Sequence, residues 1–156
     1  MFKSKNKTKS KLYSEVELHY VSPPLETLRK ANGTQAVVNV IRDFYNPKRI
    51  HLKEFYWAVF LTKTNAVLGI AEIAVGRQHS VQVNTKEIFQ LALKTNASRL
   101  VIAHNHSSND SIKASESDIK HSQELKYIAE ILDIELMDSI ILSSRFHFSL
   151  AANNLL

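Results

Sequence analysis

Two histidines and an aspartate in the second half of the chain have the residue types and spacing of a metal site. His104 and His106 flank Asn105, and Asp118 closes the segment SESD at 115–118. Residues i and i+2 of an extended strand point to the same side, so both imidazoles would face one point. Two imidazoles and one carboxylate are a common catalytic zinc set, because a fourth position stays open for water. The pattern predicts Zn²⁺ held by His104, His106 and Asp118.

Zinc chemistry also needs a group that moves protons, and the sequence offers Glu72. This glutamate interrupts the otherwise apolar segment GIAEIAVG at 69–76, where a carboxylate without a partner is costly. We therefore predict Glu72 as the general acid/base. Ser115 lies three residues before Asp118, and we expect its hydroxyl to donate a hydrogen bond to a tetrahedral oxyanion.

Each of these features also has an ordinary structural interpretation. A lone His-X-His is more often surface or loop histidine, Ser-X-X-Asp is more often a plain helix cap, and a strand glutamate such as Glu72 often faces solvent. The combination in this order favours a site over separate coincidences. His121 is one helical turn from Asp118, which makes it a candidate to approach the metal from behind the ligands, but the interpretation we favour is an exposed helix histidine.

Hydrophobic periodicity predicts the elements that would position these side chains. Apolar spacing predicts helices at 34–45, at about 86–97 after a Thr85 cap, and from 116 to about 132 after a Ser115 cap with Asp118 at N3. Short aromatic and β-branched runs predict strands at 16–20, 55–61, 66–75, 80–83, 99–103, 139–142 and 146–150. Strands flanked by long helices indicate a layered α/β domain with a mixed sheet.

The net charge of +5 comes from one short segment of the 156-residue chain. Residues 1–11 hold five lysines and no acid, which leaves 15 basic and 15 acidic residues in 12–156. We expect this Lys-rich tail to be disordered, with at most a weak, salt-sensitive contact to DNA. The absence of cysteine excludes disulfides and thiolate metal sites. No apolar run approaches the length of a membrane span and no signal-peptide pattern is present, so we expect a cytoplasmic protein without a membrane partner.

The order glutamate, His-X-His, Ser-X-X-Asp resembles the JAMM (JAB1/MPN/Mov34) metalloprotease motif. More narrowly, HNHSSNDSIKASESDI at 104–119 resembles the RadC family's His-Asn-His-Pro-Ser-Gly-Asp followed by Pro-Ser-X-X-Asp-Ile. The flanks VNTKEIFQLAL at 83–93 and ILDIELMDSIIL at 131–142 are similar to the family's flanks as well. The resemblance covers roughly residues 50–150.

The resemblance implies a cytidine-deaminase-like three-layer α/β/α fold and zinc-dependent hydrolysis of an amide or isopeptide bond. It also implies a family label of DNA repair and an unknown peptide or protein substrate, while the oligomeric state is open. It assigns the same roles to five residues: His104, His106 and Asp118 as zinc ligands, Glu72 as acid/base, and Ser115 as oxyanion donor. We expect a disordered Lys-rich tail at 1–11, an N-terminal extension with a strand and a helix at 12–50, and a JAMM/MPN RadC-like domain at 51–156.

The sequence departs from the family pattern around the expected site. Ser107, Asn109 and Ala114 replace proline, glycine and proline of the motif, the loop before Ser115 is one residue longer, and Ser139 replaces a histidine. These departures favour an alternative, a catalytically weak or metal-free JAMM-like interaction module in DNA metabolism. Other readings are less well supported: a zinc deaminase needs a Pro-Cys-X-X-Cys motif, and HNH nucleases space their three residues along a ββα unit rather than consecutively.

Overall fold

The computed structural model describes residues 20–76, 83–106 and 112–156, and their centre is one five-stranded sheet. The strands are β1 (Phe55–Leu61), β2 (Val67–Val75), β3 (Arg99–Asn105), β4 (Glu135–Leu142) and β5 (His147–Ser149). Their order across the sheet is β2-β1-β3-β4-β5. β3 and β4 are parallel and the other neighbours are antiparallel, which confirms the predicted mixed sheet.

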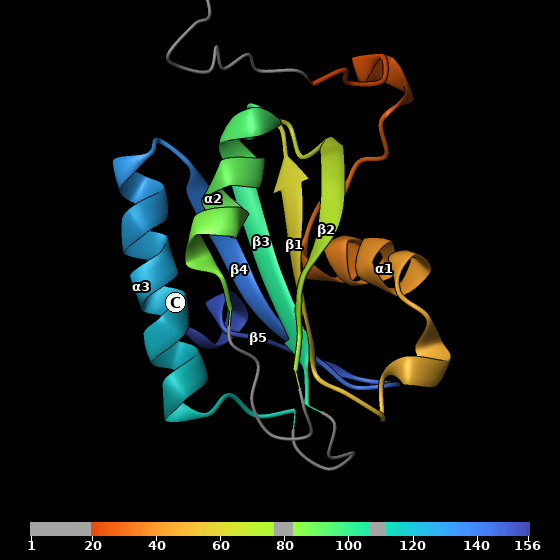
Figure 1. Cartoon of the computed structure of the whole chain (residues 1–156), viewed down its shortest axis with the longest axis vertical. Helices are drawn as coiled ribbons and strands as arrows, with labels where there is room; N and C mark the ends of the chain where they lie inside the picture. The colour runs from red at the N-terminus through yellow and green to blue at the C-terminus, as the bar shows by residue number, and fades with distance from the viewer. Residues whose placement is uncertain (1–19, 77–82, 107–111) are drawn as a thin grey trace, which may run out of the picture.

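Helices cover both faces of this sheet (Figure 1). The helices are α1 (Thr34–Phe44), α2 (Thr85–Lys94) and α3 (Glu116–Ile131), with 3-10 turns η1 (Leu25–Thr27), η2 (Pro47–Arg49) and η3 (Ala151–Asn153). One apolar cluster joins α1 to one face, and a second joins α2 and α3 to the other. The α/β class is therefore confirmed, and the cytidine-deaminase-like arrangement of these elements stays a prediction.

The sequence of β1 explains why both faces are covered, because every side chain of this strand is buried. Four of its side chains join the α1 cluster: Phe55, Trp57, Val59 and Leu61. The three between them join the α2/α3 cluster: Tyr56, Ala58 and Phe60. A strand that is apolar on both faces needs a layer on each side, so β1 lies inside the sheet and between the helices.

Several predicted elements agree closely with the structure. The hairpin of β1 and β2 is confirmed, and α3 begins at the predicted Ser115 cap. The cap of α2 was predicted at the wrong residue, because the Asn84 side chain accepts the hydrogen bond from the Glu87 backbone and Thr85 is already helical. β3 continues two residues beyond the prediction, to Asn105.

β4 is longer than predicted, because it begins at Glu135 rather than at residue 139. In the sequence, Asp138 makes residues 135–138 resemble a polar turn. In the structure Asp138 is buried, and it accepts hydrogen bonds from Thr34, Ser149 and two backbone N–H groups. A carboxylate supplied with this many donors can lie inside a sheet.

The N-terminal part of the described chain packs against the sheet. The Ala31 N–H donates to the Asn65 carbonyl, and the Val67 N–H at the start of β2 donates to the Arg29 carbonyl. Helix α1 contributes Val37, Val38 and Ile41 to the core. The predicted extension at 12–50 thus includes a helix that forms one layer of the fold.

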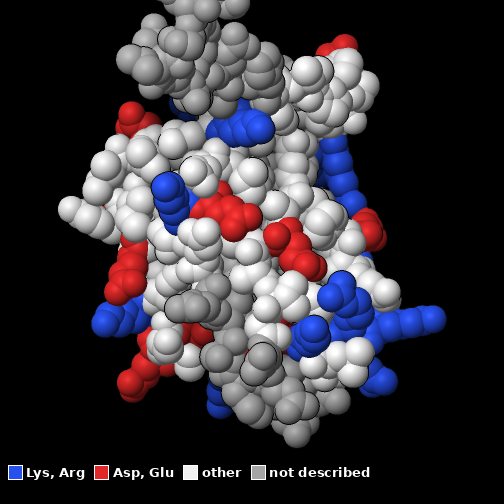
Figure 2. Space-filling view, in the orientation of Figure 1, with Lys and Arg blue, Asp and Glu red and all other residues white. Residues whose placement is uncertain are grey.

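Some sequence predictions lie outside the described residues. They are the Lys-rich tail, nearly all of the strand at 16–20, and residues 80–82 of the strand at 80–83. Among the described residues, no helix has the length and apolarity needed to cross a membrane. The face seen in Figure 2 carries both basic and acidic side chains, in line with the equal numbers of acids and bases in 12–156.

Candidate metal centre

The predicted metal ligands meet where β3 ends and α3 begins. His104 lies on β3, His106 follows directly after the strand, and Asp118 lies in the first turn of α3. α3 connects β3 to the parallel strand β4, so its first turn lies near the end of β3 from which the chain came. The continuation of β3 to Asn105 gives both imidazoles the same direction, as the i and i+2 spacing predicts.

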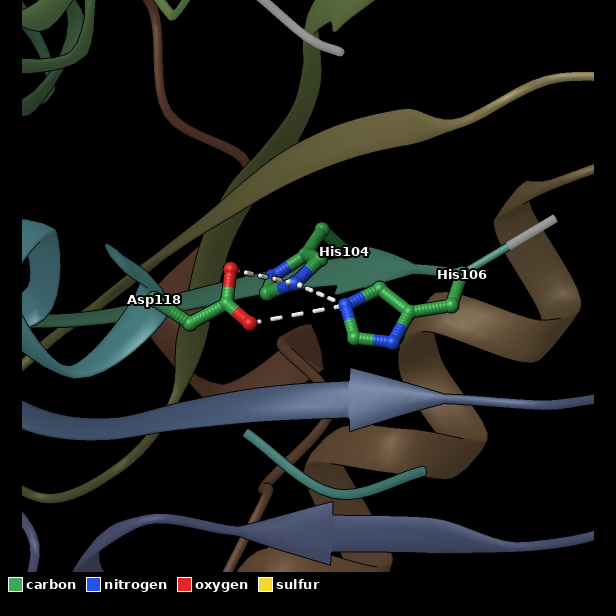
Figure 3. A group of neighbouring side chains, drawn as sticks. All are labelled: His104, His106 and Asp118. Atoms are coloured by element: carbon green, nitrogen blue, oxygen red, sulfur yellow. Dashed lines mark hydrogen bonds and ion pairs between the residues drawn. The ribbon is translucent and has the colours of Figure 1, made fainter. Parts of the chain in front are cut away.

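The nitrogen and oxygen atoms of these three side chains converge on one point (Figure 3). His104 Nε2 lies 3.1 Å from His106 Nε2 and 3.2 Å from Asp118 Oδ1, and His106 Nε2 lies 3.5 Å from Asp118 Oδ2. Tetrahedral zinc with bonds of about 2.0–2.1 Å requires its ligand atoms to be about 3.3 Å apart. Among the described residues these three form a group that could hold a metal ion, because one ligand atom from each lies within 4.8 Å of the others. The two imidazoles contact different oxygens of the Asp118 carboxylate.

A capping box fixes the carboxylate of Asp118. The Ser115 hydroxyl accepts a hydrogen bond from the Asp118 backbone N–H at 3.1 Å. In return, Asp118 Oδ2 accepts from the Ser115 backbone N–H at 2.8 Å and from the Ser115 hydroxyl at 2.7 Å. The same bonds satisfy the start of the helix and orient a candidate metal ligand. The oxyanion role predicted for Ser115 stays a prediction.

Asp118 is held in its charged form. Burial raises the pKa of this carboxyl, but hydrogen bonds from His104, His106 and Ser115 together outweigh burial and hold the pKa well below its usual range. An ionised carboxylate is the form that binds a cation, so the site keeps Asp118 ready as a ligand.

The three side chains open onto a pocket of about 580 Å³. Its lining also includes Ser115 from the cap, Glu54 and Tyr56 from the β1 region, and Ser139 from β4, where the resembling family has histidine. The buried Ser139 hydroxyl is hydrogen-bonded to Ser122 at 2.8 Å, so a compact serine pair occupies this place. The volume is within the range of small-molecule and peptide side-chain sites.

Glu72 is not brought to this pocket. It pairs with Trp57 across β1 and β2, and Trp57 packs into the α1 cluster. His104 pairs with Tyr56, whose side chain lies on the other face of the sheet. Glu72 therefore lies on the α1 face, exposed, with the sheet between it and the histidines.

Two glutamates line this pocket, Glu54 and Glu124, and Glu54 is the one that precedes β1, the strand paired with the histidine strand β3. Glu54 lies two residues before Tyr56, and His106 lies two residues after His104, so the antiparallel pairing of Tyr56 with His104 carries Glu54 toward His106. Glu54 is half-buried and lines the pocket. The register of 55–61 with 99–105 identifies Glu54, and this pairing joins segments distant in the sequence, so no local sequence pattern indicates it.

Two further polar side chains line the pocket without a hydrogen-bond partner among the described residues. The Tyr56 ring stacks on His104 with centroids 5.9 Å apart and meets His121 edge-on, and both Tyr56 Oη and His121 Nε2 are buried. Burial, and then the Asp118 charge, raise the pKa of Tyr56, whereas burial lowers the pKa of His121. The prediction of an exposed His121 is wrong, because this ring lies half-buried against Tyr56.

Comparison with known proteins supplies the family. A family model described as RadC-like JAB domain matches residues 31–155. The chain belongs to this family. The match confirms the predicted RadC and JAB/MPN resemblance, and it begins inside the predicted N-terminal extension. The JAB/MPN domain family includes metallohydrolases.

Similar curated proteins carry the name UPF0758 protein. The chain is 32% identical over 128 residues to one from Clostridium kluyveri, an alignment that covers 82% of this chain and 54% of the relative. It is 34% identical over 134 residues to one from Coprothermobacter proteolyticus, covering 84% and 57%. A third, from Desulforudis audaxviator, is 34% identical over 103 residues, covering 66% and 44%. The chain thus spans about half the length of these RadC relatives.

Proposed function

We propose that this RadC-like JAB domain is a zinc-dependent hydrolase that cleaves an amide or isopeptide bond in a peptide or protein. The observation that carries the proposal is the convergence of His104, His106 and Asp118 at the wall of a pocket, where one ligand atom of each lies within 4.8 Å of the others. Two imidazoles and a carboxylate leave one zinc position for water, as catalytic rather than structural sites do.

When bound, zinc would lower the pKa of a water molecule and polarise the substrate carbonyl. His104, His106 and Asp118 would hold the ion, and the cap at Ser115 would keep the Asp118 carboxylate in place. Glu54 takes the acid/base role in this proposal, because its carboxylate lines the pocket on the face of the sheet that carries the histidines. It would accept the proton of the attacking water and return it to the leaving amine nitrogen.

Ser115 is the proposed donor to the oxyanion. Its hydroxyl now donates to Asp118 Oδ2, and that oxygen also has the Ser115 backbone N–H as a donor. The hydroxyl proton can therefore turn toward a negatively charged substrate oxygen while Asp118 Oδ2 keeps a hydrogen bond. Such a bond would strengthen as the carbonyl oxygen gains charge.

Metal content is the first test of the proposal. Purified wild-type protein should contain one zinc ion per chain by elemental analysis, and His104→Ala should lose it. Wild-type protein that folds yet takes up no zinc would overturn the proposal and support the alternative of a catalytically weak or metal-free interaction module.

The assignment of the acid/base can be tested with a matched pair of glutamates. Glu54→Gln should retain zinc and lower the cleavage of an isopeptide-linked fluorogenic peptide by about 10²–10⁴-fold, the usual contribution of a general acid/base. Glu72→Gln is the control on the opposite face of the sheet, and its turnover should equal that of wild type. The reverse result would return the role to Glu72.

A further inference from the structure

The middle residue of His-Asn-His is the most completely buried polar side chain near the site. Asn105 is 0% exposed, and strand alternation turns its side chain away from the face that carries His104 and His106. It therefore cannot be a ligand of the same ion. A fully buried amide needs partners for its oxygen and its nitrogen, and these partners show what it does.

The Asn105 amide is bonded to three backbone groups around Glu54. Its Oδ1 accepts from the Phe55 N–H at 2.7 Å, and its Nδ2 donates to the carbonyls of Ile50 at 2.7 Å and Lys53 at 2.9 Å. Only the nitrogen can face two carbonyls, so the hydrogen-bond network fixes the orientation of the amide. The residues directly before and after Glu54 are thus both bonded to one side chain of the strand that carries the histidines.

The backbone alone does not make this connection. The ladder between β1 and β3 runs from Leu61↔Arg99 to Tyr56↔His104, and β1 begins only at Phe55. Before Phe55 the chain leaves the sheet through η2 and a turn whose side chains are mostly exposed. On the other side, the Glu54 carbonyl accepts from the Gly76 N–H at 2.8 Å. Asn105 therefore extends the β1–β3 pairing by side-chain bonds past the end of the ladder, to the position of Glu54.

We propose that Asn105 is a positioning residue that fixes Glu54 relative to the two histidines of its own strand. The inference rests on the proposed function in assigning Glu54 the proton-transfer role, but the hydrogen bonds that carry it are independent of any metal. The side-chain type agrees with the role. An amide supplies one acceptor and two donors and uses all of them here, whereas serine has a single donor proton and ionised aspartate has none.

A measurement on metal-free protein tests whether Asn105 holds the backbone around Glu54. Amide hydrogen exchange, read residue by residue by NMR, should show faster exchange of the Phe55 N–H by about tenfold or more in Asn105→Ala, beyond any change in the slowest-exchanging core amides. Asn105→Ser is a milder second variant if the alanine variant does not fold, and it should give a smaller change in the same direction. Unchanged exchange at Phe55 in a folded variant would overturn the inference.

Substituting Co²⁺, which absorbs visible light, for zinc tests whether Asn105 affects the site through Glu54. This measurement distinguishes a positioning role of Asn105 from a role in the stability of the fold. With Co²⁺ loaded, Glu54→Gln should alter the pH dependence of the visible absorption, because Glu54 lines the same pocket. Asn105→Ser should shift the midpoint of this pH dependence in the same direction as Glu54→Gln does. The double variant Asn105→Ser/Glu54→Gln should show the same midpoint as Glu54→Gln alone. An Asn105→Ser midpoint equal to that of wild type, while Glu54→Gln shifts, would overturn the inference.

Leu136→Ala is the control for lost stability. Leu136 is buried near the start of β4, at the opposite end of the sheet from the site. The Leu136→Ala protein should unfold more easily than wild type. Its Phe55 amide exchange relative to the core amides, and the pH midpoint of its cobalt absorption, should both equal those of wild type. A shifted pH midpoint in Leu136→Ala would count against positioning by Asn105. If the wild-type protein takes up no Co²⁺, the proposed function fails, and the exchange at Phe55 alone then decides whether Asn105 holds the Glu54 segment.

Discussion

Two aspartates of this molecule, Asp138 and Asp118, show how differently a protein can use a carboxylate. Asp138 is 5% exposed and accepts from the Ser149 and Thr34 hydroxyls at 2.6 and 3.2 Å. It also accepts from the backbone N–H groups of Ser139 and Ala151 at 2.8 and 3.1 Å. These neutral donors come from α1, β4, β5 and η3, so Asp138 joins four elements.

Asp118 has partners of another kind. Two of its partners are the imidazoles of His104 and His106, a side-chain type that commonly binds metal ions. The third partner is Ser115, the residue that caps α3. The Asp118 side chain is 20% exposed at the pocket rather than enclosed. The donors around Asp138 are hydroxyl and backbone N–H groups, whereas both imidazoles around Asp118 can exchange a hydrogen bond for a bond to an ion. The comparison separates a carboxylate that supports the fold from one that belongs to a site.

The largest expected effect is the loss of metal from Asp118→Asn. An amide is a poor zinc ligand, and removal of a direct ligand should cost more than the tenfold to hundredfold typical of outer partners, so we expect a loss of at least about 1,000-fold in zinc affinity. Competition with a chelating dye measures it. Asp138→Asn is the matched control and should bind zinc as wild type does. Equal zinc affinities in the two variants would remove the distinction between the two carboxylates.

The next largest effect is on the free energy of unfolding, and here substitution of Asp138 should have a larger effect than substitution of Asp118. Asp138→Ala leaves two hydroxyls and two N–H groups without their acceptor, and it should lower the free energy of unfolding by about 3 kcal/mol. Asp138→Asn should cost less, because hydroxyls can turn and accept from an amide. Denaturant unfolding of metal-free protein measures both changes. A larger loss from Asp118→Ala than from Asp138→Ala would contradict the comparison.

The same contrast shows what the sequence could and could not reveal. His104, His106 and Asp118 were predictable because strand and helix periodicity are local, and the cap at Ser115 is a local pattern as well. The sequence favours Glu72 as the acid/base because this residue interrupts an apolar strand. The choice between Glu72 and Glu54 depends on strand pairing, since the face on which a side chain lies follows from its register with β3.

Partners distant in the sequence account for the other differences. β4 was predicted too short because the donors to Asp138 come from Thr34 and from residues 149–151, which no local pattern reveals. The half-buried position of His121 depends likewise on Tyr56, which lies on a strand 65 positions earlier in the chain. Local chemistry could be predicted, and contacts between distant segments could not.

A smaller effect should follow from removing the cap that orients Asp118. Ser115→Ala loses the capping hydroxyl of α3 and one donor to Asp118 Oδ2, so we expect about 1 kcal/mol less stability and about tenfold weaker zinc binding. Asn84→Ala removes the corresponding cap of α2 and should cost about the same stability with unchanged zinc binding. Thermal unfolding and zinc titration of both variants give the two quantities. Weaker zinc binding in Asn84→Ala would mean that cap loss acts on the site through general loosening.

The smallest effect concerns acid. The folded pKa of Asp118 lies below its unfolded value of about 3.9, so the unfolded chain takes up the proton first as the pH falls. The stabilisation from the charged carboxylate is therefore present above about pH 4 and is lost as the pH falls toward the folded pKa. The difference in unfolding free energy between metal-free wild type and Asp118→Asn should shrink between about pH 5 and about pH 2.5, by no more than about 1 kcal/mol. A difference that stays constant over this range would show that the imidazoles and Ser115 hold Asp118 without favouring its charged form.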